Sequence, residues 1–381
     1  MFKKKITYGY DDIGIMSAIT TEIEHRAECN TKKNGMLPIF TAPMSTVINE
    51  RNADIFEDNG IIPIIPRSVD IARRNEIVKT GRWVSYSLNE FEQFIEDNDT
   101  VNPGTKILID LANGHMEKIF ELAKKARAKY GYEDLELMSG NINNPEAYRE
   151  YCAAGINWCR VGIGGGKGCL SSTQLSLHVG IATLINETYK IKKEVEEDIK
   201  GAYTNYKCVT KIIADGGIRD YRHVNVALAL GADYVMIGSL LSSLVESCAT
   251  TFYYDKENNI HTVDQMSPNT KIRENGGLFG ITDMYHGEEV DYHVVDNLKK
   301  NFYGMASSMG QKDLFGEKVR TVEGKQVILD CTTNIDKWVE NMSDYLASAM
   351  SYCNIRDVND FSPENVDTVL LSESEKAAIN K

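Results

Sequence analysis

One cysteine stands in a sequence context in which a thiol could do chemistry. Cys169 lies in VGIGGGKGCLSSTQ (161–174), where a β-like run ends in a glycine-dense loop before a stretch of helical character. A thiolate is a nucleophile, and the backbone N–H groups of such a loop stabilise negative charge beside it. The other cysteines lack this context, and we expect them to be small buried apolar residues. The sequence therefore predicts one reactive thiol, with the Ser171 hydroxyl placed to bind or activate a water.

Two further β-like runs downstream of this cysteine also end in glycine. They are IIADGGIRD (212–220) and YVMIGSLL (234–241). Glycine loops at the carboxyl ends of barrel strands bind phosphate through their backbone N–H groups. Asp215 ends its run and, when ionised, only accepts hydrogen bonds, which suits the two hydroxyls of a ribose. Each loop alone could be a tight turn without a ligand, but together the loops predict a phosphate site. Its predicted donors are Gly216, Gly217, Gly238 and Ser239.

The composition excludes several classes of protein. The net charge of −13 and the pI of about 5.1 argue against nucleic acid or an anionic membrane as the main partner. No run approaches the roughly 20 apolar residues of a membrane span, and MFKKKITYGYDD lacks the apolar core of a signal peptide. The cysteines are irregularly spaced and the histidines are scattered. We therefore expect reduced thiols, a cytoplasmic protein and no catalytic metal.

Eight short β-like runs recur along the chain, with amphipathic helical stretches between several of them. Such helices are predicted at 115–131, 144–155 and 222–231. This alternation favours parallel strands joined by crossover helices, and so predicts an α/β fold, a (β/α)8 TIM barrel. A doubly wound sheet would require a GxGxxG loop after the first strand, which the N-terminal region lacks. The predicted strands lie within 36–43, 60–66, 83–88, 106–112, 135–140, 156–164, 211–217 and 233–239.

The barrel is expected to form one domain over residues 1–361, followed by a polar C-terminal tail at 362–381. Residues 334–353 have the pattern of an amphipathic helix that could pack on the barrel or on a neighbouring subunit. The charged run at 190–200 is predicted to be a solvated helix face.

Several motifs, taken together, resemble the IMP dehydrogenase/GMP reductase family. They are GIGGGKGC around Cys169, ADGGIRD, ALALGADYVMIGSLL and FYGM (302–305). YDDIGI (10–15) and PIFTAPMSTV (38–47) are similar to the first elements of the family's barrel. The resemblance runs from residue 8 to the SYCNIRDVNDF segment (351–361), which is nearly the whole chain.

This resemblance implies a purine nucleotide as substrate and hydride transfer between purine C2 and a nicotinamide. Cys169 then corresponds to the nucleophile that attacks C2, Ser171 stands where the family has a catalytic Thr, and Asp215 would hold the ribose. The implied substrate-binding residues are Met44, Gly164, Gly166, Asp215, Gly216, Gly217, Gly238, Ser239, Gly304, Met305, Ser307 and Glu323. Those on the cofactor side are Asp110, Ala112, Asn113, Asn141 and Gly162. The resemblance also implies NADPH, or NAD in a dehydrogenase, a monovalent cation such as K⁺, and a homo-oligomer, commonly a tetramer.

Short motifs favour one branch of the family. The motifs LANGH, FYGM and RTVEGK (320–325) are more similar to the corresponding sequences of the reductases than to those of the dehydrogenases. The chain lacks the CBS insertion common in dehydrogenases, and it lacks their Arg–Tyr pair because Arg320 is followed by Thr321. We therefore expect a GMP reductase that converts GMP to IMP and ammonia through a Cys169 thioimidate. The alternatives are an IMP dehydrogenase, which oxidises IMP to XMP with NAD, and a nucleotide-binding relative that has lost catalysis.

Besides Ser171, two positions near the expected site depart from the family's pattern. Lys167 replaces a phosphate-binding Ser, and it could contact phosphate or point to solvent. Ser308 stands where reductases have an acidic residue that would donate a proton to the departing ammonia. Asp313 or Glu323 could replace that acid, although a solvated carboxylate is the alternative for either. The direction of the reaction and the preference among GMP, IMP and a deoxynucleotide therefore stay open.

Overall fold

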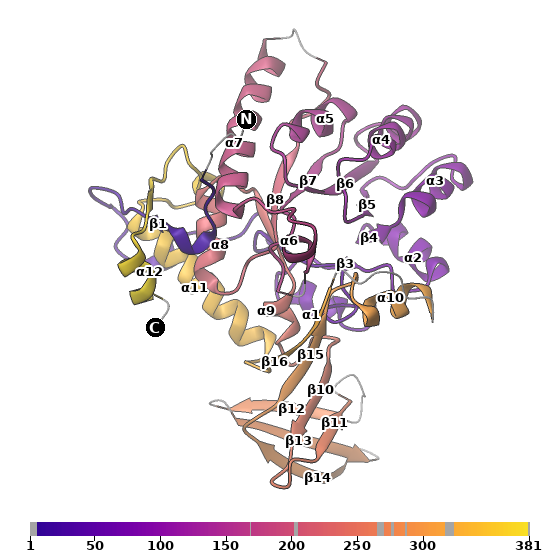
Figure 1. The fold of residues 1–381 in the computed structure, drawn as a ribbon, viewed down its shortest axis with the longest axis vertical. Helices are drawn as coiled ribbons and strands as arrows, with labels where there is room; N and C mark the ends of the chain where they lie inside the picture. Colours follow the sequence, from indigo (N-terminus) through magenta and orange to yellow (C-terminus); the bar gives the residue numbers. More distant parts are fainter. Residues whose placement is uncertain are drawn as a thin grey trace.

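The centre of the molecule is a barrel of eight parallel strands (Figure 1). The structure, a computed structural model, describes residues 6–167, 169–201, 205–264, 270–275, 278–285, 288–316 and 324–379. The strand order is β2-β9-β8-β7-β6-β5-β4-β3, and a parallel bridge between Phe40 and Ile62 closes the ring. The predicted (β/α)8 TIM barrel is confirmed, with every strand inside its predicted range or within two residues of it. The strands are β2 (Ile39–Thr41), β3 (Ile64–Ile65), β4 (Trp83–Tyr86), β5 (Thr105–Asp110), β6 (Leu135–Ile142), β7 (Trp158–Val161), β8 (Lys211–Asp215) and β9 (Tyr234–Ile237).

Helices surround the barrel, and local sequence sets their limits (Figure 1). At the start of α3, Ser87 and Glu90 form a capping box, which satisfies two backbone N–H groups. After α5, Gly155 takes a left-handed conformation with φ +74°, which ends the helix. The three helices predicted from amphipathic spacing correspond to α4, α5 and α8. The helices up to the end of the barrel are α1 (Ala53–Asp58), α2 (Ile71–Ile77), α3 (Leu88–Asp97), α4 (Glu117–Tyr130), α5 (Ala147–Ala154), α6 (Ser171–Gln174), α7 (Ile181–Lys200), α8 (Tyr221–Ala229) and α9 (Ser239–Ser242).

Large aromatic side chains fill the barrel near the amino ends of its strands. Trp83, Trp158 and Tyr234 each begin a strand, and Phe40 packs against all three with ring centroids 5.4–6.0 Å apart. These rings belong to a buried cluster that also holds apolar residues from the other strands. The barrel is therefore a packed core at this end, which leaves the carboxyl ends of the strands for a site.

Antiparallel strands between the barrel and the last long helix extend away from the barrel (Figure 1). One sheet has the order β11-β10-β15-β16 and another the order β12-β13-β14. A separate small core that includes Phe279, Ile281 and Leu298 lies beneath them. The sequence predicts no strands here, because these segments lack long apolar runs. The elements are β10 (Thr250–Tyr254), β11 (Ile260–Val263), β12 (Thr270–Asn275), β13 (Leu278–Tyr285), β14 (Glu288–Val295), β15 (Lys299–Tyr303), α10 (Ser308–Phe315) and β16 (Gln326–Asp330).

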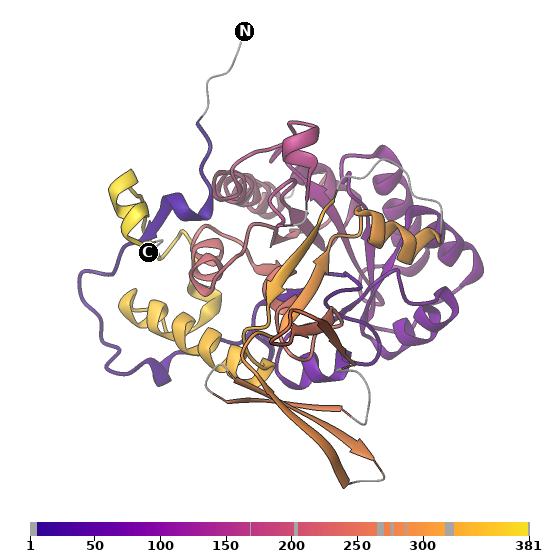
Figure 2. The ribbon, with the colours of Figure 1, turned by 60° about the horizontal axis from the view of Figure 1, so that its bottom comes forward.

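The two ends of the chain meet beside helix α8. Strand β1 (Ile13–Ile15) pairs antiparallel with β17 (Thr368–Leu370), and Figure 2 shows the yellow C-terminal segment beside the indigo strand. The predicted amphipathic helix is α11 (Ile335–Tyr352), which packs on α8. The tail predicted as polar thus contributes a strand and the short helix α12 (Glu373–Ile379). Among the described helices, none is long and apolar enough to cross a membrane. Short 3-10 turns are η1 (Tyr10–Asp12), η2 (Arg26–Glu28), η3 (Val78–Thr80) and η4 (Val358–Asp360).

Candidate active site

A cavity of about 630 Å³ opens at the carboxyl ends of the barrel strands. Its volume suits a ligand of nucleotide size. Most of the residues singled out from the sequence line it, although they come from six strand ends and from the segment after β15. The predicted residues in its wall are Met44, Asp110, Ala112, Asn141, Gly162, Gly164, Gly166, Cys169, Ser171, Asp215, Gly216, Gly217, Gly238, Ser239, Gly304 and Met305.

Three predicted residues do not belong to this described wall. Ser307 is buried at the start of α10, where its hydroxyl caps the helix by accepting from the Gly310 N–H at 3.1 Å. Asn113 accepts from the His115 N–H at 3.1 Å and does not line the cavity. Glu323 lies outside the described residues. The structure thus gives Ser307 a capping contact, which a serine at a helix start commonly makes.

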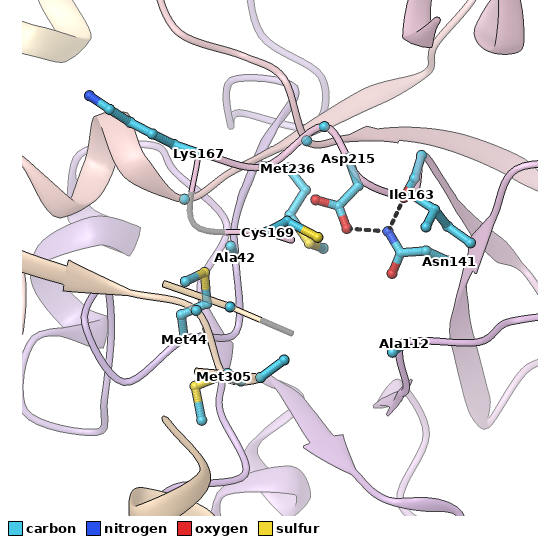
Figure 3. Close-up of a pocket in the computed structure, with 18 of the residues that line it drawn as sticks. Ala42, Met44, Ala112, Asn141, Ile163, Lys167, Cys169, Asp215, Met236 and Met305 are labelled. Atoms are coloured by element: carbon cyan, nitrogen blue, oxygen red, sulfur yellow. Dashed lines mark hydrogen bonds between the residues drawn. The ribbon is translucent and has the colours of Figure 1, made fainter. Parts of the chain in front are cut away.

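Cys169 lies half-buried in the cavity wall, in the loop between β7 and α6. Its thiol donates to the Ser171 hydroxyl, with 3.3 Å between sulfur and oxygen. Its backbone forms an antiparallel bridge with Gly324, so the segment before β16 lies across the cysteine loop. Figure 3 shows the sulfur facing the same space as Asp215 and Met305. A thiol placed this way can reach a bound ligand, and a hydroxyl lies beside it.

Glycines allow the loops after β7 and β8 to approach each other closely. Gly162 has φ +134°, and a Cβ on it would collide with the carbonyl oxygen of Asp215. Gly217 has φ +78°, a conformation that side chains rarely adopt. The glycines at these positions therefore do more than shorten the turns, since they bring the cysteine loop beside the aspartate that ends β8.

A chain of opposite charges links the ends of four strands on the floor of the cavity. Arg160 in β7 donates to Asp215 at 2.9 Å and to Asp110 at 2.8 Å, and Arg67 after β3 donates to Asp110 at 3.2 Å. Asn141 in β6 donates to the same Asp215 oxygen, Oδ2, at 2.7 Å, and to the carbonyl of Gly162. All these bonds to Asp215 use Oδ2, so its Oδ1 is available to a ligand. Figure 3 shows the Asn141 oxygen directed toward Ala112.

The opposite charges around them keep Asp110 and Arg160 ionised. Burial alone would raise the pKa of the Asp110 carboxyl, but the guanidiniums of Arg160 and Arg67 outweigh burial and lower that pKa. Burial would likewise lower the pKa of Arg160, but the carboxylates of Asp215 and Asp110 raise it above its ordinary value. The network therefore presents a rigid, fully paired arrangement, and Asp110 is a carboxylate rather than a proton donor.

Sequence reasoning missed both arginines of this network. Arg160 is 8% exposed, and it lies inside INWCRVGIG, which was interpreted only as an apolar strand. A buried arginine is almost always paired, so an arginine inside such a run was the signal that a carboxylate faces it. Arg67 follows the second predicted strand (60–66), and the sequence there carries no such signal.

The two departures from the family's pattern now have a structural context. Lys167 is exposed, and Figure 3 shows its side chain extending away from Cys169 and Asp215, so the solvent alternative describes its position here. Ser308 is exposed at the start of α10 and does not line the described cavity. Asp313 is also exposed and accepts from Ser45 at 2.6 Å and from Tyr303 at 3.0 Å. Asp313 ties α10 to the loop after β2, and within the described wall the carboxylates are Asp110 and Asp215.

Apolar side chains form the opposite wall. Met44 and Met305 lie on this side, and Phe302 also lines the cavity, whereas Met236 on β9 is the register partner of Asp215. Figure 3 shows Met44 and Met305 across the cavity from Asp215. Flexible thioethers adapt to flat rings, so this wall suits an aromatic base while the glycine loops and Asp215 suit polar groups.

Comparison with known proteins agrees with this arrangement. The family model described as IMP dehydrogenase / GMP reductase domain matches residues 101–285, which include β5 to β9 and all the strands of the charge network except β3. A GMP reductase of Streptococcus suis (strain 05ZYH33) is 26% identical over 98% of both chains. A GMP reductase of Helicobacter pylori (strain G27) is 27% identical over 96% of this chain and 97% of its own. The chain is therefore similar to GMP reductases over almost its whole length, and its central part, which includes the cysteine loop, matches the IMP dehydrogenase / GMP reductase domain.

Proposed function

We propose that this protein is a purine-nucleotide oxidoreductase that reductively deaminates GMP to IMP and ammonia with NADPH. The observation that carries the proposal is the Cys169 thiol facing the same cavity as the Asp215 carboxylate, beside three glycine loops. The relatives named GMP reductase support this direction of the reaction over its alternatives, because they align over nearly the whole chain.

The proposed reaction uses the thiol as a nucleophile in two steps. The Cys169 thiolate forms a bond to C2 of GMP, the bond from C2 to the amino nitrogen breaks, and ammonia leaves with the added proton. A reduced nicotinamide bound on the side of Asp110, Ala112 and Asn141 would supply the hydride for the C2–H bond of IMP. The C2–S bond breaks in that step and returns the thiolate. Covalent catalysis thus divides one difficult substitution into two easier steps.

The charge network assigns a role to each oxygen of Asp215. Oδ2 accepts from Arg160 and Asn141, so the carboxylate has a fixed orientation before any ligand binds. Oδ1 is then the acceptor for the ribose hydroxyls. The loops of Gly217, Gly238 and neighbouring residues would donate N–H groups to the 5′-phosphate.

On the cofactor side of the cavity, the hydrogen-bonding groups of the protein suit the carboxamide of a nicotinamide. Asn141 uses its amide N–H groups on Asp215 and Gly162, which leaves its oxygen to accept from a carboxamide N–H. Asp110 and Ala112 line the same side. When bound there, the cofactor supplies the hydride, and the buried, paired carboxylates keep that region of the cavity free of an unpaired charge.

A second candidate is nucleotide binding without turnover. It is favoured by one observation: both carboxylates in the described wall accept from arginine, so neither is placed to protonate the departing ammonia. In the proposed enzyme, the Ser171 hydroxyl beside the sulfur or a water bound to it would pass the proton.

The test compares the Cys169→Ala variant with a matched Cys29→Ala control outside the cavity. Absorbance at 340 nm follows NADPH consumption with GMP, and NADH formation from IMP and NAD measures the dehydrogenase alternative. We expect Cys169→Ala to abolish turnover and to keep GMP binding in calorimetry, while Cys29→Ala keeps both. Turnover in Cys169→Ala would disprove the role of the thiol. Binding without turnover in the unmodified protein would favour the second candidate.

A further inference from the structure

We infer that His223 is a positioning residue that fixes the phosphate-binding loop Gly216–Arg219 to the N-terminal turn η1. This inference rests on the proposed function, since it concerns the loop that would hold the nucleotide's phosphate. The loop lines the cavity, yet it contains two glycines with positive φ, +95° at Gly216 and +78° at Gly217. Such a loop has a defined shape only if contacts outside the cavity hold it.

His223 makes the contact that holds the end of this loop. The backbone N–H of Arg219 donates to Nδ1 of His223 at 3.1 Å. A backbone nitrogen can only donate, so Nδ1 must be the unprotonated nitrogen and Nε2 must carry the hydrogen. Nε2 lies 2.9 Å from Oδ1 of Asp11 and therefore donates to it. One imidazole thus joins the phosphate loop to the N-terminal segment.

Tyr10 supports the middle of the loop from the same side. Its ring stacks on the His223 ring, with centroids 5.3 Å apart and planes 26° apart. A Cβ at Gly217 would lie 3.4 Å from Cε2 of Tyr10, which places the ring directly against the loop backbone. Tyr10 is 3% exposed and His223 is 2% exposed, so water does not compete with these contacts.

Charged groups around the imidazole fix it in turn. Asp220 caps α8 by accepting from the His223 backbone N–H at 3.2 Å. Arg222 forms ion pairs with Asp11 and with Asp220. The carboxylate of Asp11 is therefore held by a second partner besides His223. We therefore expect the loop to be ordered before phosphate binds.

Two substitutions separate the contacts of the two ring nitrogens. In His223→Asn the side-chain oxygen takes the position of Nδ1 and can still accept from Arg219. In His223→Gln the side-chain amide reaches the position of Nε2 and can still donate to Asp11, but Arg219 loses its acceptor. If His223 only stabilised helix α8, both variants should lose affinity for nucleotides and nucleosides by the same factor.

The experiment measures the contribution of the phosphate to binding. Calorimetry gives the Kd of GMP and guanosine, and of IMP and inosine, for the unmodified protein and both variants. Loss of one hydrogen bond that orders the loop should reduce the nucleoside-to-nucleotide Kd ratio about 3- to 10-fold in His223→Gln. His223→Asn should recover most of that ratio, and urea unfolding confirms that both variants fold.

Amide hydrogen exchange provides a readout that does not depend on the purine. We expect the Arg219 amide to exchange faster in His223→Gln than in the unmodified protein or in His223→Asn. Inorganic phosphate should slow exchange at Gly216–Arg219 in the unmodified protein and less so in His223→Gln. An unchanged Kd ratio, or equal losses for nucleoside and nucleotide, would overturn the inference. If the unmodified protein binds neither nucleotide, the proposed function fails, and the exchange result with phosphate decides the inference alone.

Discussion

Replacing Arg160 with methionine should destabilise the protein strongly at neutral pH, by an amount that depends on pH. Arg160 is the one described residue that touches both Asp110 and Asp215, and all three side chains are 10–14% exposed. Removing one partner of a buried ion pair leaves an uncompensated charge and costs about 3–5 kcal/mol. Because Arg67 still faces Asp110, we expect about 4 kcal/mol at pH 7 rather than a larger loss.

The sign of the pH dependence follows from Asp110. In the unmodified protein Arg160 and Arg67 outweigh burial and lower the pKa of Asp110, so the pairing stabilises the fold above the ordinary pKa of aspartate. This stabilisation is lost as the pH falls through that range. In Arg160→Met, Arg67 alone opposes burial, so the pKa of Asp110 rises above its value in the unmodified protein. Its protonation at mildly acidic pH therefore relieves the penalty, and the stability difference between the two proteins shrinks on acidification.

Urea unfolding at pH 7 and at pH 5 measures both quantities. Arg160→Lys serves as the matched control, because it keeps the charge but cannot donate to both carboxylates in the same way, and should lose less. Adding Asp110→Asn to Arg160→Met should recover part of the loss, since it removes a stranded charge. A loss below about 1 kcal/mol at pH 7, or a loss that grows on acidification, would refute the account of the network.

Two further predictions concern a buried lysine and a close approach of backbone. Lys300 is fully buried, and burial lowers its pKa to about 8, so the fold loses stability as the pH falls from the ordinary lysine pKa of about 10.4 to 8. Lys300→Met should raise the free energy of unfolding, measured with urea at pH 7, by about 2 kcal/mol. This figure allows for the lost hydrogen bond from Lys300 to the Val245 carbonyl. A gain of the same size at pH 10.5 would contradict this reasoning. Gly162→Ala should weaken GMP binding about tenfold in calorimetry, because its Cβ collides with the backbone of Asp215 and moves the ribose acceptor. Gly131→Ala, also at positive φ but with open space around it, is the control and should leave that affinity unchanged.

The barrel could be predicted from the sequence because its strands are buried on both faces. Such strands appear as continuous apolar runs between helices, and all eight were visible. The antiparallel sheets beyond β9 were not, since strands such as β12, with the sequence TKIREN, have a polar composition. These strands pair with segments that lie far away along the chain, and a local sequence pattern does not predict such long-range pairing.

The candidate site was predictable to the same extent. Cys169 and Asp215 lie in glycine-rich motifs at strand ends, so the residues next to them in the sequence identify them as candidate site residues. Arg160 and Arg67 act through partners on other strands, and only the closed barrel brings those strand ends together. Ser307 was assigned to the substrate from the resemblance, whereas its contact in the structure is the cap of α10.

The pairing of β1 with β17 relates the phosphate loop to the order in which the chain is synthesised. Asp12 and Lys376 form an ion pair although they are 364 positions apart, and β1 meets β17 beside them. On a ribosome that adds about 5–20 residues per second, all eight barrel strands emerge well before β17. Until then β1 is an unpaired strand, although Tyr10 and Asp11 already have their partners His223 and Arg222 in α8. A nascent chain can therefore close its barrel, and place the N-terminal turn beside the loop Gly216–Arg219, before β17 exists to pair with β1.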